Sequence, residues 1–350
     1  MILKRNSIAV IATSVFAALG TGLPALAEII VPEGGAGTAL RLSDALIPAG
    51  RIEGLGNVHG MAAAPGRGIL VAGSLATVSR GEVMKPADVS QADHAAHHGS
   101  GMKTQNETAD EVGLVTLVDI GSGTIQRQIE VPAGVHHVTV DPAERWAVVT
   151  HPALDAVSII DLDTAAVTAT VPTGGNPNYA VFDDPTGLFY VSNAADATIT
   201  GVDPATGTVQ TTLETPGGVE HMVIEVAGRR IWGAEADDGQ VDEIDLEAGA
   251  VSRSFAIRGE LHGIALDPAS GEVFVAAREQ GQIARIDPQA ETVTFAKGQA
   301  APYHVEIDGD LLIVSDAQID QVAAFRLRDL ELVATVPTRS TGHQMVVLPD

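Results

Sequence analysis

The chain has 350 residues, no cysteine and a formal net charge of −25 that arises from 20 basic and 45 acidic residues. Such an acidic surface repels phosphate backbones and attracts cations, so we expect no nucleic-acid partner. Without cysteine the chain forms no disulfide, and any metal site must use His, Asp, Glu or Met side chains.

The first 27 residues have the pattern of a secretion signal. Lys4 and Arg5 form a basic start, residues 8–19 are apolar, and Ala25-Leu26-Ala27 fits the small-residue cleavage pattern. The apolar run is too short for a transmembrane helix, and we find no later segment that could span a membrane. We therefore expect a signal peptide over 1–27, a mature domain over 28–350 without membrane insertion, and a periplasmic location.

A unit of about 40 residues recurs along the rest of the chain. Its clearest copy runs from Tyr179 to Leu213 and reads as four short strands separated by turn residues. The same opening pattern recurs at seven positions, namely Gly60, His137, Tyr179, His221, Gly263, His304 and Gln344. Four-stranded units at this period are the blades of a β-propeller, so the sequence predicts an all-β, seven-bladed propeller.

Two departures from the repeat have simple interpretations. The first interval is 77 residues long, although only one set of strands lies within it. We interpret residues 76–111 as a loop inserted between the second and third strands of one blade. The last unit stops after its first strand, Gln344 to Leu348, so we expect its other strands to come from residues 29–53. The ring would then close with strands from both ends of the chain.

Histidine gathers at the entrances of these units. The two residues at each entrance are His59-Gly60, His136-His137, Asn178-Tyr179, Glu220-His221, His262-Gly263, Tyr303-His304 and His343-Gln344. Seven of these fourteen residues are histidine, although histidine accounts for only 11 of the 350 residues. Because the first strand of every blade lines the central channel, residues about 40 apart in sequence converge on one mouth of the channel.

Imidazole binds Zn, Cu, Fe and Ni, so this ring predicts a metal site. The candidate ligands are His59, His136, His137, His221, His262, His304 and His343, with Glu220 as a carboxylate candidate. The first and second entrance positions can form separate tiers, and the sequence leaves open which tier faces the axis. It also leaves open a purely structural ring, in which the imidazoles pack between blades.

The inserted loop contributes three further histidines. His94, His97 and His98 lie in a segment that is expected to leave the blade on the same face as the entrances, and we predict that they assist metal capture. His151, near the same face, is equally compatible with a structural role. Met61, Met222 and Met345 follow entrance histidines, and we interpret them as core residues, although thioether ligation would favour copper.

Tyr190-Val-Ser-Asn193, with the Asp-Pro and Thr-Gly turn residues of the same unit, resembles the YVTN-type, YncE-like propeller repeat. That superfamily contains lactonase-like enzymes, haem-binding propellers and binding proteins. The exported propeller with a histidine ring and a His-bearing loop is similar to the AztD-type periplasmic zinc metallochaperones. This resemblance implies zinc as cargo and, as partner, the solute-binding protein of a metal ABC transporter.

Two other functions stay open at this point. One is a copper- or zinc-dependent enzyme, an oxidase or a lactonase-like hydrolase, with Glu220, Tyr179 and Tyr303 as conceivable acids or bases. The other is a propeller that holds haem through one axial histidine. We expect a binding protein rather than an enzyme, because the sequence indicates no substrate pocket.

Overall fold

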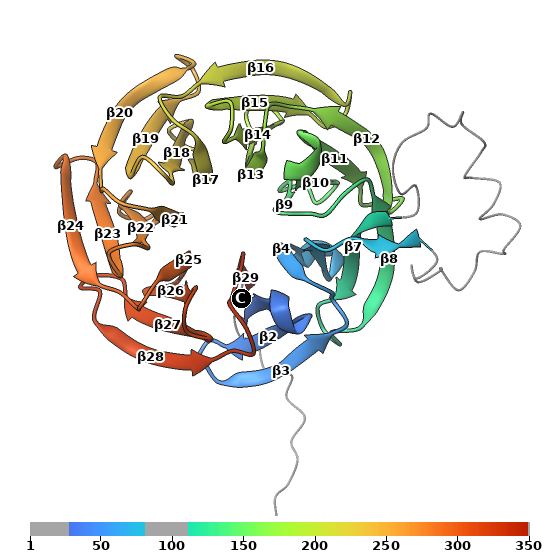
Figure 1. Cartoon of the computed structure of the whole chain (residues 1–350), viewed down its shortest axis with the longest axis horizontal. Helices are drawn as coiled ribbons and strands as arrows, with labels where there is room; N and C mark the ends of the chain where they lie inside the picture. The colour runs from blue at the N-terminus through green and yellow to red at the C-terminus, as the bar shows by residue number, and fades with distance from the viewer. Residues whose placement is uncertain (1–27, 81–110, 349–350) are drawn as a thin grey trace, which may run out of the picture.

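The computed structural model describes residues 28–80 and 111–348, which form β-strands and short 3-10 helices. Seven antiparallel sheets stand around one axis, so the predicted seven-bladed β-propeller is confirmed (Figure 1). Each blade has its first strand innermost and its fourth strand outermost. Within the described part, no helix has the length and apolar character needed to cross a membrane.

Five blades each consist of four consecutive strands. Blade 2 contains β9 (Val138–Val140), β10 (Trp146–His151), β11 (Ala156–Asp161) and β12 (Ala166–Pro172). Blade 3 contains β13 (Pro177–Asp183), β14 (Leu188–Asn193), β15 (Thr198–Asp203) and β16 (Thr208–Glu214). Blade 4 contains β17 (Val219–Glu225), β18 (Arg230–Glu235), β19 (Gln240–Asp245) and β20 (Ala250–Ala256). Blade 5 contains β21 (Leu261–Leu266), β22 (Val273–Ala277), β23 (Gln282–Asp287) and β24 (Thr292–Lys297). Blade 6 contains β25 (Pro302–Asp308), β26 (Leu311–Asp316), β27 (Gln321–Arg326) and β28 (Leu332–Pro337).

Blade 1 differs from the other blades in the long stretch of sequence between its second and third strands. It contains β4 (Val58–Ala64), β5 (Ile69–Ser74), β7 (Glu111–Asp119) and β8 (Ile125–Val131), and the inserted residues lie between β5 and β7. The beginning of the insertion forms the short strand β6 (Val78–Ser79), which pairs with the start of β7. His94, His97 and His98 lie outside the described residues. Short 3-10 helices follow three strands: η1 (Gly34–Ala36), η2 (Pro65–Arg67) and η4 (Pro152–Leu154).

Blade 7 closes the ring as predicted. The C-terminal strand β29 (Val346–Leu348) pairs with β1 (Glu28–Glu33), which continues into β2 (Thr38–Ser43) and β3 (Pro48–Glu53). Buried Glu33 accepts hydrogen bonds from Thr38 Oγ1 at 2.6 Å, Arg51 Nε at 2.9 Å and the Arg339 N–H at 2.7 Å. Burial alone would raise the pKa of Glu33, but these bonds lower it. The ionised carboxylate therefore ties the connection that leads into β29 to the N-terminal strands.

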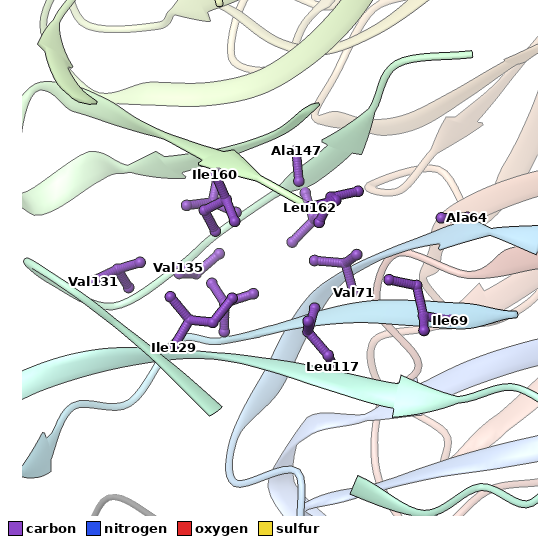
Figure 2. Close-up of a cluster of buried hydrophobic side chains, with 13 residues drawn as sticks. Ala64, Ile69, Val71, Leu117, Ile129, Val131, Val135, Ala147, Ile160 and Leu162 are labelled. Atoms are coloured by element: carbon purple, nitrogen blue, oxygen red, sulfur yellow. The ribbon is translucent and has the colours of Figure 1, made fainter. Parts of the chain in front are cut away.

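Apolar side chains fill the space between neighbouring blades. Figure 2 shows one such cluster, in which Val71 and Leu117 of blade 1 pack with Ala147 and Ile160 of blade 2. Side chains alternate between the two faces of a strand, so each inner blade strand can present apolar residues to both neighbouring blades. A similar buried cluster forms at each of the other blade junctions. This packing fixes where the first strands begin, and hence where the entrance residues lie.

The Gln344 side chain links blade 7 to blades 1 and 2. Its Oε1 atom accepts from the Met61 N–H at 3.1 Å and the Val138 N–H at 3.3 Å, and its Nε2 donates to the Val138 carbonyl at 2.9 Å. We predict that Gln344→Ala lowers the free energy of unfolding by about 1–3 kcal/mol, because buried backbone groups lose their partners. Urea denaturation followed by circular dichroism measures the change.

The matched control is Gln318→Ala, since Gln318 is exposed in the turn after β26. This control should stay within about 0.5 kcal/mol of the parent protein. Equal stabilities for the two variants would contradict the linking role of Gln344.

Candidate metal centre

The strand entrances have an irregular backbone. In five blades the pairing of the first and second strands shifts register at the entrance residues, for example between Val58 and Gly60 and between Val219 and His221. A β-bulge sets two residues against one on the partner strand and redirects a side chain. Consecutive entrance residues therefore need not point to opposite faces, as they would in a regular strand.

His221 of β17, His262 of β21 and His304 of β25 form a compact triad from three successive blades. One ligand atom from each lies within 4.8 Å of the others. The His221 and His262 ring centroids are 4.0 Å apart, and those of His262 and His304 are 4.8 Å apart. All three side chains are buried. The triad combines one first-position and two second-position histidines, so the two entrance positions do not form separate tiers.

His59, His136 and His343 form a second group, which we call the mouth histidines. The His59 ring lies 4.4 Å from the His136 ring and 4.1 Å from the His343 ring. His59 Nδ1 bonds the His136 carbonyl at 2.9 Å, and His136 Nδ1 bonds the Asn178 carbonyl at 3.1 Å. A carbonyl only accepts, so both Nδ1 atoms carry the proton and both Nε2 atoms keep a lone pair. Metal-ligating histidines are usually oriented in this way.

His137 belongs to the ring but differs in its proton position. The Ala180 N–H donates to His137 Nδ1 at 3.2 Å, so the neutral ring carries its proton on Nε2 and offers no free lone pair. Its ring lies 3.4 Å from that of Tyr179, which also contacts His221 at 5.0 Å. His137 therefore supports Tyr179 beside the triad rather than supplying a ligand atom.

Glu220 does not join the donor group of the triad. It is half-buried on β17, and its pKa is raised by burial and by the nearby carboxylates of Asp237 and Glu260. His151 is structural, because its ring nitrogens lie 3.1 Å from the Gly134 carbonyl and 2.8 Å from Ser158 Oγ. These contacts hold the connection into β9 within its own blade.

The methionines that follow entrance histidines are core residues, as interpreted from the sequence. Met61, Met222 and Met345 are each at most 2% exposed and lie in three different apolar clusters. Tyr179 and Tyr303 have a role that the sequence did not indicate, since both rings stack on histidines of the ring. Tyr303 lies 3.6 Å from His262 and 4.8 Å from His304, so tyrosines complete the aromatic wall around the triad.

Burial keeps the imidazoles neutral. It lowers the pKa of His221, His262 and His304 well below the usual range, with neighbouring rings adding to the effect. Burial and nearby His59 lower the pKa of His136 to about 4, and burial with the same neighbour lowers that of His343 to about 3. Proton competition for these nitrogens is therefore weak between pH 7.5 and 5.5, a range in which an exposed histidine titrates.

The triad has polar atoms that nothing in the described structure satisfies. Both ring nitrogens of His221, Nδ1 of His262 and Nε2 of His304 are buried and have no hydrogen-bond partner among the described residues. Each such atom costs about 1–3 kcal/mol. A tetrahedral ion with bonds of about 2.0–2.1 Å needs ligand atoms about 3.3 Å apart, which small side-chain rotations from the observed spacing supply. The donor set therefore fits a bound Zn²⁺.

Two cavities flank the histidines. A cavity of about 300 Å³ at the mouth is lined by His343, Tyr303 and Arg278, and the Arg278 charge is paired with Glu260. It gives His343 a route to solvent. A larger cavity of about 740 Å³ occupies the other half of the channel; Tyr179 lines it, but no histidine of the ring does.

Comparison with known proteins supports the fold. Residues 164–309 match a family model described as a repeat of unknown function, DUF6923. A putative 6-phosphogluconolactonase from Bacteroides fragilis superposes with a TM-score of 0.72 at 10% identity, covering 94% of this chain and 99% of that one. Hydrazine synthase from Kuenenia stuttgartiensis superposes with a TM-score of 0.58 at 18% identity, covering 65% of this chain and 83% of that one. The chain has no significant match among curated proteins. At these identities the structural neighbours establish a shared propeller architecture only. They carry no information on the activity of this chain.

Because burial keeps the ring histidines neutral, we predict that acid destabilises the metal-free protein. The unfolded chain takes up protons near pH 6.5, whereas folded His136 resists protonation down to about pH 4, so stability is lost as pH falls through this window. Burial raises the pKa of Glu306 to about 8, and burial together with Asp242 raises that of Glu235 to about 7. Protonation of these two carboxyl groups stabilises the folded protein as pH falls, which opposes the effect of the histidines.

Comparing His136→Gln with the parent protein isolates the imidazole contribution. We expect the parent to lose up to about 3 kcal/mol more than the variant between pH 7 and pH 4.5, measured by urea denaturation in the presence of a chelator. Parallel pH profiles for the two proteins would show that His136 is not held neutral by burial.

Proposed function

We propose that this protein is a periplasmic zinc-binding protein that takes up Zn²⁺ at the channel mouth and passes it to another protein. The observation that carries the proposal is the buried triad His221, His262 and His304, whose neutral imidazoles have unpartnered nitrogens. Three imidazole ligands leave a fourth coordination position open, and an open position allows ligand exchange.

Zinc fits this donor set better than Cu(I). Soft Cu(I) favours thioether and thiolate ligands, but the chain has no cysteine and the three methionines near the ring lie in apolar clusters. The remaining donors are imidazoles, which suit Zn²⁺. Cu(II) also binds imidazole strongly, so metal analysis of protein purified without added metal separates the two ions.

The mouth histidines offer a path between solvent and the triad. His136 and His343 are partly exposed, whereas His59 and the triad are buried. The His304 ring lies 6.4 Å from that of His59 and 6.2 Å from that of His343. An ion can therefore exchange one imidazole at a time without release into bulk water. Glu220, with Asp237 and Glu260 nearby, adds negative charge that attracts cations.

A transfer protein is favoured over a metalloenzyme by the position of the large cavity. A substrate of a metal-dependent reaction must reach the ion, yet no ring histidine lines the 740 Å³ cavity, and Tyr179 lies between that cavity and His221. We therefore propose a protein acceptor that docks at the mouth. The resemblance to zinc metallochaperones suggests the solute-binding protein of a metal ABC transporter as this acceptor.

Removing two triad ligands should abolish tight zinc binding. We expect His221→Gln/His304→Gln to weaken Zn²⁺ affinity by more than about 100-fold, because even second-shell changes cost 10–100-fold. Competition with a chromophoric chelator measures affinity, and zinc should raise the melting temperature of the parent but not of the double variant.

The control for this experiment is His151→Asn, which removes a histidine outside the ring. Asparagine is the natural residue at the equivalent end of β14, where Asn193 bonds Thr200 at 2.8 Å. The control should bind zinc like the parent. Parent-like binding by the double variant would make the triad structural.

We predict that the histidines of the inserted segment affect the rate of zinc transfer. Changing His94, His97 and His98 to Ala should leave equilibrium affinity within a few fold, because the triad supplies the proposed primary ligands. It should slow zinc passage to an acceptor, since additional histidines on the face expected from the sequence would raise the local metal concentration. Stopped-flow transfer to a chelator measures the rate. An unchanged rate would limit the loop to a linker, and a loss of binding would make its histidines primary ligands.

A further inference from the structure

The half of the channel opposite the histidines contains a cavity of about 740 Å³. Its walls come from the innermost strands of five successive blades, β9, β13, β17, β21 and β25 (Figure 1). Residues in the turns after these strands, such as Val226, Pro268 and Gly309, also line it. The cavity therefore opens on the face opposite to the mouth histidines, and its size suits a small organic molecule.

The walls are mainly apolar. They include Phe182, Met222, Ile224, Ile264, Leu266 and Ile307. At the inner end, Tyr179 contacts His137 and His221 on one side and lines the cavity on the other. One aromatic ring thus separates this cavity from the metal centre, and a ligand here would occupy a site of its own.

Apart from Tyr179, the titratable groups that line the cavity are carboxyl groups. Its lining contains Glu306 and Asp267 but no Lys, Arg or His. Asp267 already accepts hydrogen bonds from Ser270 Oγ at 2.6 Å and the Ala269 N–H at 3.0 Å. Glu306, in contrast, makes no hydrogen bond or ion pair with any described residue. A carboxyl group among apolar walls without a partner is costly, and a cationic ligand would provide that partner.

We propose that this cavity binds an organic ammonium ion with an apolar body, whose ammonium group pairs with Glu306 and whose hydrocarbon part contacts the apolar walls. Anionic ligands are disfavoured because no cationic side chain lines the cavity, and the net charge of −25 attracts cations to the protein. The Tyr179 ring at the inner end offers an aromatic surface that also favours a cation. A phosphorylated sugar, such as the substrate named for the Bacteroides neighbour, does not suit this lining.

A series of three probes of matched shape tests the charge requirement on the unaltered protein. Isothermal titration calorimetry should detect 2-phenylethylamine binding at millimolar concentration or below. The neutral isostere 2-phenylethanol should bind at least about tenfold more weakly, and the anion phenylacetate should not bind detectably. Equal binding of the amine and the alcohol, or no binding of the amine, would overturn the proposal.

Two variants locate the site. Glu306→Gln keeps the side-chain shape and should weaken amine binding at least about tenfold, whereas Glu331→Gln, an exposed residue of the same blade, should not. The zinc-site variant His221→Gln/His304→Gln should retain amine binding. Its retention together with a loss of zinc binding separates this site from the metal centre, and unchanged amine binding by Glu306→Gln would contradict the assignment.

Discussion

The close approach of seven innermost strands around one axis is the constraint on which the rest of the structure depends. A Cβ atom added to Gly60 would lie 2.8 Å from the His137 backbone, and one added to Gly263 would lie 2.7 Å from the Tyr303 carbonyl oxygen. Glycine at these positions lets the next blade approach without a clash. The entrance histidines consequently lie close together, with ring centroids of neighbouring pairs 4.0–6.4 Å apart, so their chemistry determines the chemistry of the channel mouth.

The last residue of the second strand shows how residue type and hydrogen-bond partners together define a structural role. Glu33, Glu235 and Asp316, each at the end of a second strand, accept a backbone N–H from the connection that enters the blade. His151 occupies the equivalent position in blade 2, and its nitrogens have partners. The triad histidines are equally buried, but key nitrogens lack partners. The presence or absence of hydrogen-bond partners therefore distinguishes the candidate triad from the structural His151.

The channel has two halves of opposite chemistry on either side of Tyr179. Imidazoles fill the half at the entrances, whereas apolar side chains and an unpaired Glu306 line the half that follows them along the same strands. The structural neighbours share the propeller architecture, but the candidate functional groups of this protein are side chains of the inner strands. The proposed function therefore rests on these side chains rather than on the fold itself.

The sequence by itself determined the architecture and the place of the histidines. Seven copies of one pattern predicted seven blades, and the single strand at the C-terminal end predicted closure by residues 29–53, because an incomplete blade leaves an unpaired edge. Only the tertiary structure decided which histidines act together. The bulges at the entrances let His262 join His221 and His304, and the Ala180 N–H fixes the His137 proton on Nε2. The sequence likewise did not indicate the surroundings of Glu306, because the apolar walls of its cavity come from four other blades. Such contacts join residues 40 or more positions apart, where local sequence carries no information on distance or proton position.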